Sequence, residues 1–105
     1  MIQILEEELS NSKKLRQLYE RELKKIPKGN VSKKEIRSHF YYYLQYRENG
    51  QLHCRYLGKL NKNQLKKYEK IRKEREQIIK NLNIANKQIK LIKKMLNDKK
   101  LQSAA

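Results

Sequence analysis

Residues 40–60, FYYYLQYRENGQLHCRYLGKL, decide the fold that the sequence predicts. This segment holds six of the eight aromatic residues, and aromatic side chains fit the pleated surface of a β-sheet. Glu48-Asn49-Gly50 is typical of a turn, so residues 40–47 and 51–57 are expected to pair as an antiparallel hairpin. A shorter strand at about 31–36 is expected to precede them and to complete a three-stranded meander.

The length of the turn decides which side chains share a face. A two-residue loop at Asn49-Gly50 pairs Tyr46 with His53 and mixes polar and apolar side chains on both faces. A three-residue loop, with a bulge at Gly50, pairs Tyr46 with Leu52 and gives one apolar face, so we predict this register. The face toward the helices then carries Phe40, Tyr42, Leu44, Tyr46, Leu52, Cys54 and Tyr56, and the opposite face carries Tyr41, Tyr43, Gln45, Arg47, Gln51, His53 and Arg55.

One helix is predicted on each side of the sheet in the chain. Residues 2–25 carry apolar side chains at spacings of three and four, and Pro27 ends this helix. Residues 61–98 form a second helix of about 57 Å, in which Asn61 caps the start and Gln64 reaches back to it. The predicted core stripes are Ile2, Leu5, Leu9, Ser12, Arg16, Tyr19, Leu23 and Ile26 in the first helix, and Tyr68, Ile71, Arg75, Ile78, Leu82, Ala85, Ile89, Ile92 and Leu96 in the second.

The predicted architecture is one α+β domain, a long antiparallel helical hairpin resembling a coiled coil with a small two- or three-stranded antiparallel sheet at its tip. Residues 99–105 are expected to form a flexible tail. The shorter first helix is expected to cover the second only from about residue 62 to about residue 86. Apolar side chains beyond that point favour a homodimer. The predicted dimer or partner interface consists of Ile84, Ile89, Leu91, Ile92, Met95 and Leu96.

The charge of the chain is high and unevenly distributed. Lys and Arg number 27 against 11 Asp and Glu, which gives a formal charge of +16. Residues 27–60 carry 7 basic and 2 acidic side chains, hence +5, and residues 61–105 carry 14 and 4, hence +10. This asymmetry indicates an anionic partner. Solvated lysine faces, or a genome whose codons favour Lys and Asn, are alternatives that the sequence leaves open.

The sheet face opposite the helices is the predicted nucleic-acid interface, because it holds aromatic, amide and cationic side chains and no carboxylate. Arg binds phosphate or reads guanine, Gln reads adenine, and Tyr stacks or bonds to phosphate. A small sheet can also enter the major groove of DNA. A solvated sheet face of the same composition is the alternative. The candidate residues are Tyr41, Tyr43, Gln45, Arg47, His53, Arg55 and Lys59.

Three segments carry a resemblance to known proteins. Pro27-Lys28-Gly29, residues 40–50 and Arg55-Tyr56-Leu57-Gly58-Lys59 resemble a small prokaryotic family of uncharacterised proteins with the pattern "PKG … YYYLQYRE-G … KYLGK". That family implies no established activity. The order of aromatic strand, glycine turn, basic strand and helix is also similar to arm-type DNA-binding domains of phage integrases. This similarity implies that outward residues between 41 and 55 enter the major groove.

An enzymatic role is not expected. Asp98 is the only aspartate, and the adjacent His53 and Cys54 point to opposite faces of a strand, so neither an acidic pair nor a zinc site is indicated. No glycine-rich phosphate loop occurs, and no cofactor is expected. No apolar run reaches the ~20 residues of a membrane span, and a lone cysteine suits the cytoplasm, where the protein is expected.

Two functions from different classes remain. The first is a non-enzymatic nucleic-acid-binding protein that uses the basic aromatic sheet face and the Lys-rich second helix, with duplex DNA favoured over RNA, acting as an accessory or regulatory protein of a mobile element. The second is a protein-interaction module, such as an antitoxin or a phage-encoded inhibitor of the anti-CRISPR type, that binds a host enzyme or a protein–RNA complex.

Overall fold

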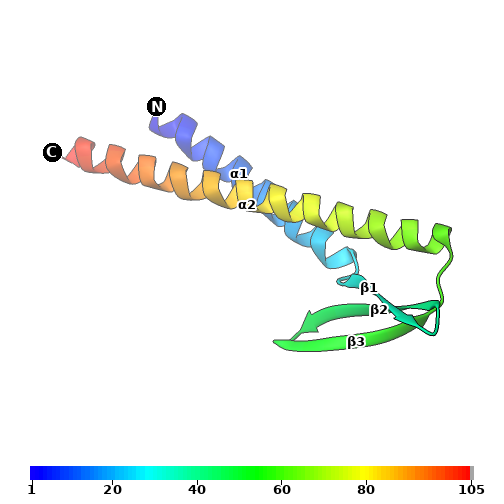
Figure 1. Ribbon diagram of the computed structural model, residues 1–105. Coiled ribbons are helices and arrows are strands. Elements are labelled where there is room, and N and C mark those ends of the chain that lie inside the picture. Colours follow the sequence, from blue (N-terminus) through cyan, green and yellow to red (C-terminus); the bar gives the residue numbers. More distant parts are fainter. Residues whose placement is uncertain (105) are drawn as a thin grey trace. The chain divides into compact units, whose positions relative to one another are not determined.

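The computed structural model describes residues 1–104, with side chains described as far as Lys100. Its elements in chain order are α1 (Ile2–Lys25), β1 (Asn30–Ile36), β2 (His39–Glu48), β3 (Gln51–Gly58) and α2 (Lys62–Ala104) (Figure 1). The predicted fold class, α+β with two long helices and a three-stranded antiparallel sheet, is confirmed. Within the described range, neither helix has the length and apolar character needed to cross a membrane.

The chain is divided into two compact units. One unit is Ile26–Glu76, which contains the sheet and the first part of α2. The other unit combines Met1–Lys25 with the chain from Gln77 onward, so it contains α1 and the remainder of α2. The single domain predicted from the sequence therefore contains two units, and the continuous helix α2 belongs to both.

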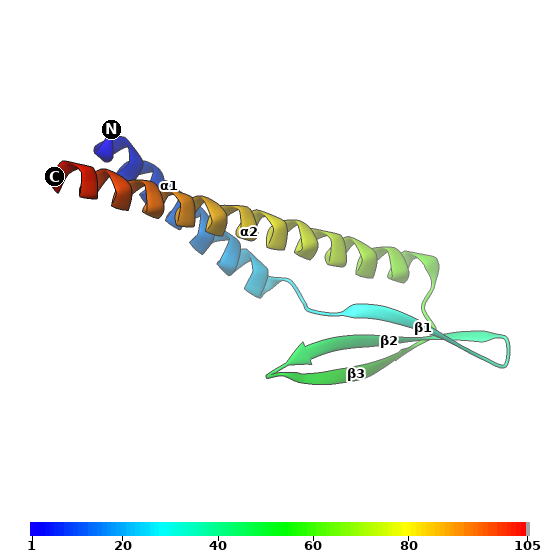
Figure 2. The ribbon, with the colours of Figure 1, turned by 60° about the vertical axis from the view of Figure 1, so that its left-hand side comes forward.

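The sheet is a meander in the order β1-β2-β3, with both pairs antiparallel (Figure 2). Both connections are two-residue turns with left-handed backbone, at Arg37-Ser38 (φ 51° and 66°) and at Asn49-Gly50 (φ 53° and 77°). Positive φ at both central residues defines the type I′ turn, whose twist matches that of the flanking strands.

The predicted three-residue loop after β2 is wrong. Tyr46 pairs with His53 and Glu48 with Gln51, which leaves only Asn49-Gly50 in the turn. The local preference of Asn-Gly for the type I′ turn outweighs the formation of one apolar face, because no residue of the three strands is fully buried.

The bulge lies instead near the end of β3. Tyr43 pairs with Tyr56 but Tyr42 pairs with Gly58, so Leu57 is the extra residue. The corrected register exchanges the two faces of β3, whereas β2 alternates as predicted. We call the two sides the helix-side face, with Val31, Lys33, Tyr42, Leu44, Tyr46, His53 and Arg55, and the outer face, with Lys34, Tyr41, Tyr43, Gln45, Arg47, Leu52, Cys54 and Tyr56.

The helix-side face is defined by what lies against it in the same unit. Val31 and Tyr42 line a groove together with Leu65, Tyr68 and Arg72 of α2. Arg75, further along α2, donates a hydrogen bond from Nη1 to the carbonyl oxygen of Ile26, 3.3 Å away. The first four turns of α2 therefore belong to the same unit as the sheet and border this groove.

In the second unit, α1 runs antiparallel to the part of α2 from Gln77 onward, and both chain ends lie at the same end of this pair in Figures 1 and 2. We call these two segments the helical pair. Every residue of both predicted core stripes is buried or half-buried, which confirms the stripes. Ser12 and Ala85 are among the four most buried side chains, so the burial in this unit includes small residues of both helices.

The predicted range over which α1 covers α2 is wrong. Ile89 and Leu96 are only 3% and 6% exposed within a single chain, and Ile92 is half-buried. Residues 62–76 belong to the unit of the sheet, whereas the 24 residues of α1 form a unit with the later part of α2. Ile89 and Leu96 are therefore core residues and are not available to the predicted dimer interface, whereas Ile84, Leu91 and Met95 stay exposed.

The start of α2 agrees with the prediction, whereas its C-terminal end does not. At its start, Gln64 N–H donates to Asn61 Oδ1 (2.8 Å) and Asn61 N–H donates to Gln64 Oε1 (3.0 Å), which confirms the predicted reciprocal cap. At its end the helix continues to Ala104, so residues 99–104 are helical where a flexible tail was predicted. Ala105, the last residue of that predicted tail, lies outside the described residues.

Replacing Asn61 by Ala is expected to lower the free energy of unfolding by about 1 kcal/mol, because the Gln64 N–H loses its side-chain acceptor. Thermal and urea unfolding followed by circular dichroism measures this loss. The control is Asn63→Ala, an exposed position inside the same first turn, which is expected to leave stability unchanged or slightly raised. Equal stability of the two variants would contradict the role of the cap.

Candidate nucleic-acid interface

Three tyrosines form a cluster on the outer face. Alternation along β2 places Tyr41 and Tyr43 on one side, and the register places Tyr56 opposite Tyr43. The ring centroids of Tyr43 and Tyr56 are 5.3 Å apart with planes inclined at 51°, and those of Tyr41 and Tyr56 are 6.4 Å apart at 34°. Such tilted pairs attract each other. Tyr56 stays 58% exposed, so the half-buried Tyr41 and Tyr43 support a ring that is open to solvent.

The bulge in β3 also positions a cation beside this tyrosine cluster. After Leu57 the backbone turns through Gly58, whose φ is 79°. The next residue, Lys59, holds its Nζ 5.9 Å from the centroid of the Tyr41 ring. This distance is at the limit of a cation–π contact, so the ammonium group remains available to an anion.

Apart from Leu52 and Cys54, the rest of the outer face is polar or cationic. Gln45 and Arg47 follow the tyrosines along β2, and Lys34 of β1 pairs with Tyr41. All three side chains are exposed. Within the described sheet, Glu35 pairs with Phe40 and Glu48 with Gln51, so both carboxylates of the strands lie on the helix-side face. The outer face therefore combines three cations with exposed aromatic surface and no carboxylate.

Two of the predicted interface residues lie on the other side of the sheet. The ring of His53 stacks on that of Tyr46 at 5.2 Å with planes inclined at 17°. Arg55 lines a shallow pocket with Lys28, Leu44 and Glu48. Both belong to the helix-side face, so the prediction that they share a surface with Tyr41 and Tyr43 is wrong. The physical reason is the two-residue turn, which shifts β3 by one position.

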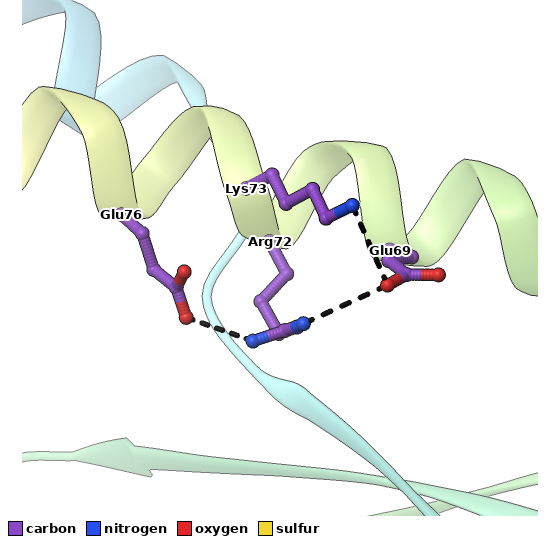
Figure 3. A network of polar contacts seen from close by, with 4 residues as sticks. All are labelled: Glu69, Arg72, Lys73 and Glu76. Carbon is purple, nitrogen blue, oxygen red and sulfur yellow. Dashed lines mark hydrogen bonds and ion pairs between the residues drawn. The ribbon is translucent and has the colours of Figure 1, made fainter.

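Two acidic residues of α2 in this unit, Glu69 and Glu76, form ion pairs with neighbouring cations on the same helix. Figure 3 shows Arg72 between Glu69 and Glu76, with Arg72 Nη1 2.8 Å from Glu76 Oε1 and Nη2 3.8 Å from Glu69 Oε1. Lys73 Nζ lies 3.7 Å from the same Glu69 oxygen. Exposed pairs of this kind add little stability. Glu69 and Arg72 line the groove with Val31 and Tyr42, so this pair lies on the helix side of the sheet.

Sequence reasoning missed four outer-face residues, namely Lys34, Leu52, Cys54 and Tyr56. The signal that could have placed Tyr56 is the Asn49-Gly50 dipeptide, which on its own favours the two-residue hairpin. Cys54 was predicted to face the helices but is exposed on the outer face. Among the described residues no group of three His, Cys, Asp or Glu side chains is placed to hold a metal ion.

The fold and this face define a small α+β protein with a solvent-exposed aromatic and cationic sheet surface. The chain belongs to the family described as "Domain of unknown function (DUF6788)", whose model matches residues 2–67. The match covers α1, the whole sheet and the first residues of α2. No curated protein and no solved structure matches the chain.

Proposed function

We propose that this protein binds nucleic acid without catalysing a reaction, and that it contacts duplex DNA with the outer face of its sheet. The observation that carries the proposal is that both carboxylates of the sheet lie on the helix-side face, which leaves the outer face with cations alone. Lys34, Arg47 and Lys59 lie on or beside the outer face, and Glu35 and Glu48 lie on the other. A surface with cations and no carboxylate attracts phosphate, and phosphate contacts supply most of the affinity of DNA-binding proteins.

The same face offers groups that contact bases. Arg47 can donate two hydrogen bonds to guanine and Gln45 can pair with adenine, and both side chains are exposed. The outer strands of a three-stranded sheet lie about 10 Å apart, close to the width of about 12 Å of the major groove. The similarity to arm-type integrase domains supports this placement and a role as an accessory or regulatory protein of a mobile element.

A second candidate function is a protein-interaction module, such as an antitoxin or a phage-encoded inhibitor. The observation that favours it is the exposed apolar surface of the helical pair, where Ile4, Ile84 and Leu91 are each more than half exposed. Exposed apolar patches mark protein contacts. This surface is separate from the residues of the outer face.

Binding to a duplex DNA oligomer, measured by fluorescence anisotropy across a salt series, tests the proposal. Three cations on phosphates predict a log–log slope of affinity against salt of about −2.7, at about −0.9 per phosphate. No binding at low salt, or binding insensitive to salt, would contradict it. Single-stranded DNA and RNA of the same sequence serve as comparison ligands. If a single strand binds more tightly than the duplex, the exposed Tyr56 ring stacks on unpaired bases and the duplex assignment is wrong.

A further inference from the structure

An exposed strip along the later part of α2 combines apolar side chains with lysines. Its apolar members, Ile84, Leu91 and Met95, are 55%, 58% and 42% exposed. At 100° per residue they lie about 120° around the helix from its buried stripe, so they stay exposed although α1 packs on the same helix. Three lysines at seven-residue spacing lie within about 60° of Leu91. We call this surface the basic strip, and it consists of Lys80, Ile84, Lys87, Leu91, Lys94 and Met95.

Leu91 lies among lysines in one hollow of the α2 surface. The residues that line the hollow with Leu91 are Lys87, Lys90, Lys93, Lys94 and Asn97. The stem of a lysine is a hydrocarbon chain that covers apolar surface, while its ammonium group extends to a polar boundary. The hollow therefore offers apolar contact around Leu91 and positive charge at its rim.

The charge of the helical pair comes from α2. α1 carries six Lys and Arg beside five Glu, hence +1, whereas residues 77–100 carry seven Lys and one Asp, hence +6. From Gln77 to Asn97 the sequence has no carboxylate, so no acidic side chain of that segment neutralises the basic strip. The partner that complements this surface is therefore anionic and also offers apolar contact.

We propose that the basic strip binds the surface of an anionic lipid bilayer, with the later part of α2 lying in the plane of the headgroups. Lipid phosphates there face the ammonium groups, and the acyl chains below them contact Ile84, Leu91 and Met95. The strip is about 23 Å long at 1.5 Å per residue. Within the described residues neither helix can cross a membrane, so the contact is with the surface of the bilayer.

The composition of the basic strip favours lipid over two other classes of partner. The phosphates of nucleic acid contact cations and leave the three apolar side chains in water. Protein interfaces are enriched in arginine and aromatic residues and depleted of lysine, but residues 77–100 contain many lysines and neither arginine nor an aromatic residue. Lysines beside aliphatic side chains are typical of helices that lie on anionic membranes.

Sedimentation of the full-length chain with vesicles tests the proposal. Vesicles of phosphatidylcholine and phosphatidylglycerol in equal amounts are expected to bind the chain at least about tenfold more tightly than phosphatidylcholine alone. Lys87→Gln with Lys94→Gln is expected to weaken this binding about 20-fold, at about fivefold per lysine. The matched control, Lys33→Gln with Arg55→Gln, removes the same charge from the helix-side face of the sheet and is expected to change it at most a few-fold.

A tryptophan probe tests whether the apolar side chains enter the bilayer. The chain contains no tryptophan, so a single one reports its own surroundings. The fluorescence of Leu91→Trp is expected to shift to shorter wavelength when the mixed vesicles are added, because the indole ring leaves water. Ile79→Trp is the control, since Ile79 is 36% exposed and lies about 120° around α2 from Leu91, and its emission is expected to stay unchanged.

The same variants separate lipid binding from the proposed binding of DNA by the sheet. Lys87→Gln with Lys94→Gln is expected to lower the affinity for duplex DNA at most a few-fold, and circular dichroism checks that each variant is folded. A larger loss for DNA than for vesicles would assign the lysines to nucleic acid and overturn the proposal. No binding to mixed vesicles, equal binding to both kinds of vesicle, or an unshifted Leu91→Trp spectrum would also overturn it, and would leave the exposed apolar side chains to a protein partner.

Discussion

Changing Arg47 and Lys59 together to glutamate is expected to weaken duplex DNA binding on the order of 100-fold at about 0.1 M salt. Arg47 is exposed on the outer face, and Lys59 lies beside the tyrosine cluster. The double change removes two phosphate contacts and introduces two carboxylates into a face that has none. The slope of affinity against salt is expected to fall by about 1.8, at about 0.9 for each lost contact. Fluorescence anisotropy across a salt series measures both quantities.

The control for this variant carries the same change of charge on the other side of the sheet. Lys33 lies over the ring of Phe40 at 4.3 Å, and Arg55 pairs with Leu44, so both belong to the helix-side face. Lys33→Glu with Arg55→Glu lowers the net charge from +16 to +12, as the outer-face variant does. We expect the control variant to lose at most several-fold in affinity for duplex DNA. Equal losses for the two variants would show that only the overall charge matters and that the outer face is not the interface.

The same measurements distinguish the hairpin register predicted from the sequence from the register observed in the structure. The register predicted from the sequence places Arg47 and Arg55 on one face, so that both would contact DNA. In the structure Tyr46 pairs with His53 and the two arginines lie on opposite faces. A loss for Arg47→Glu alone but not for Arg55→Glu alone therefore supports the observed register as well as the site.

The helices could be predicted in detail because their signals are local. Spacings of three and four identify the side chains that α1 and α2 bury, and Ser12 and Arg16 are correctly included although both are polar. The cap at Asn61 is equally local, since both of its hydrogen bonds join residues three positions apart. Patterns of this kind depend on helix geometry alone and not on the rest of the fold.

Two features could not be predicted in the same way. They are the part of α2 that lies against α1 and the side of the sheet on which each β3 side chain lies. Ile89 is buried because α2 begins alongside the sheet, and that division of the helix is a tertiary property that periodicity does not encode. For β3, the prediction assumed that the hydrophobic pattern selects the register, which holds only when one face is fully buried. Here Leu52 and Tyr56 are both more than half exposed, so the turn selects the register instead.

Replacing Gly29 by Ala is expected to destabilise the unit of residues 26–76 by about 2–4 kcal/mol. Its φ of 132° is a backbone conformation that L residues rarely adopt. A Cβ there would also lie 2.7 Å from Leu44 Cδ1 and 3.2 Å from the carbonyl oxygen of Gln45. The Leu44 side chain can rotate away, but the carbonyl belongs to the paired backbone of β2 and cannot. Urea unfolding followed by circular dichroism, with hydrogen exchange of the sheet amides, measures the loss.

The matched control is Gly50→Ala, which separates backbone strain from contact. Gly50 also has a positive φ, 77°, but a Cβ there would meet nothing within 4 Å. Its substitution is therefore expected to cost only about 1 kcal/mol. If Gly29→Ala costs no more than Gly50→Ala, the contact with β2 is relieved and the larger figure is wrong. If it costs more, the glycine of the Pro27-Lys28-Gly29 segment is required by the close approach of the chain to β2, and its presence needs no ligand to explain it.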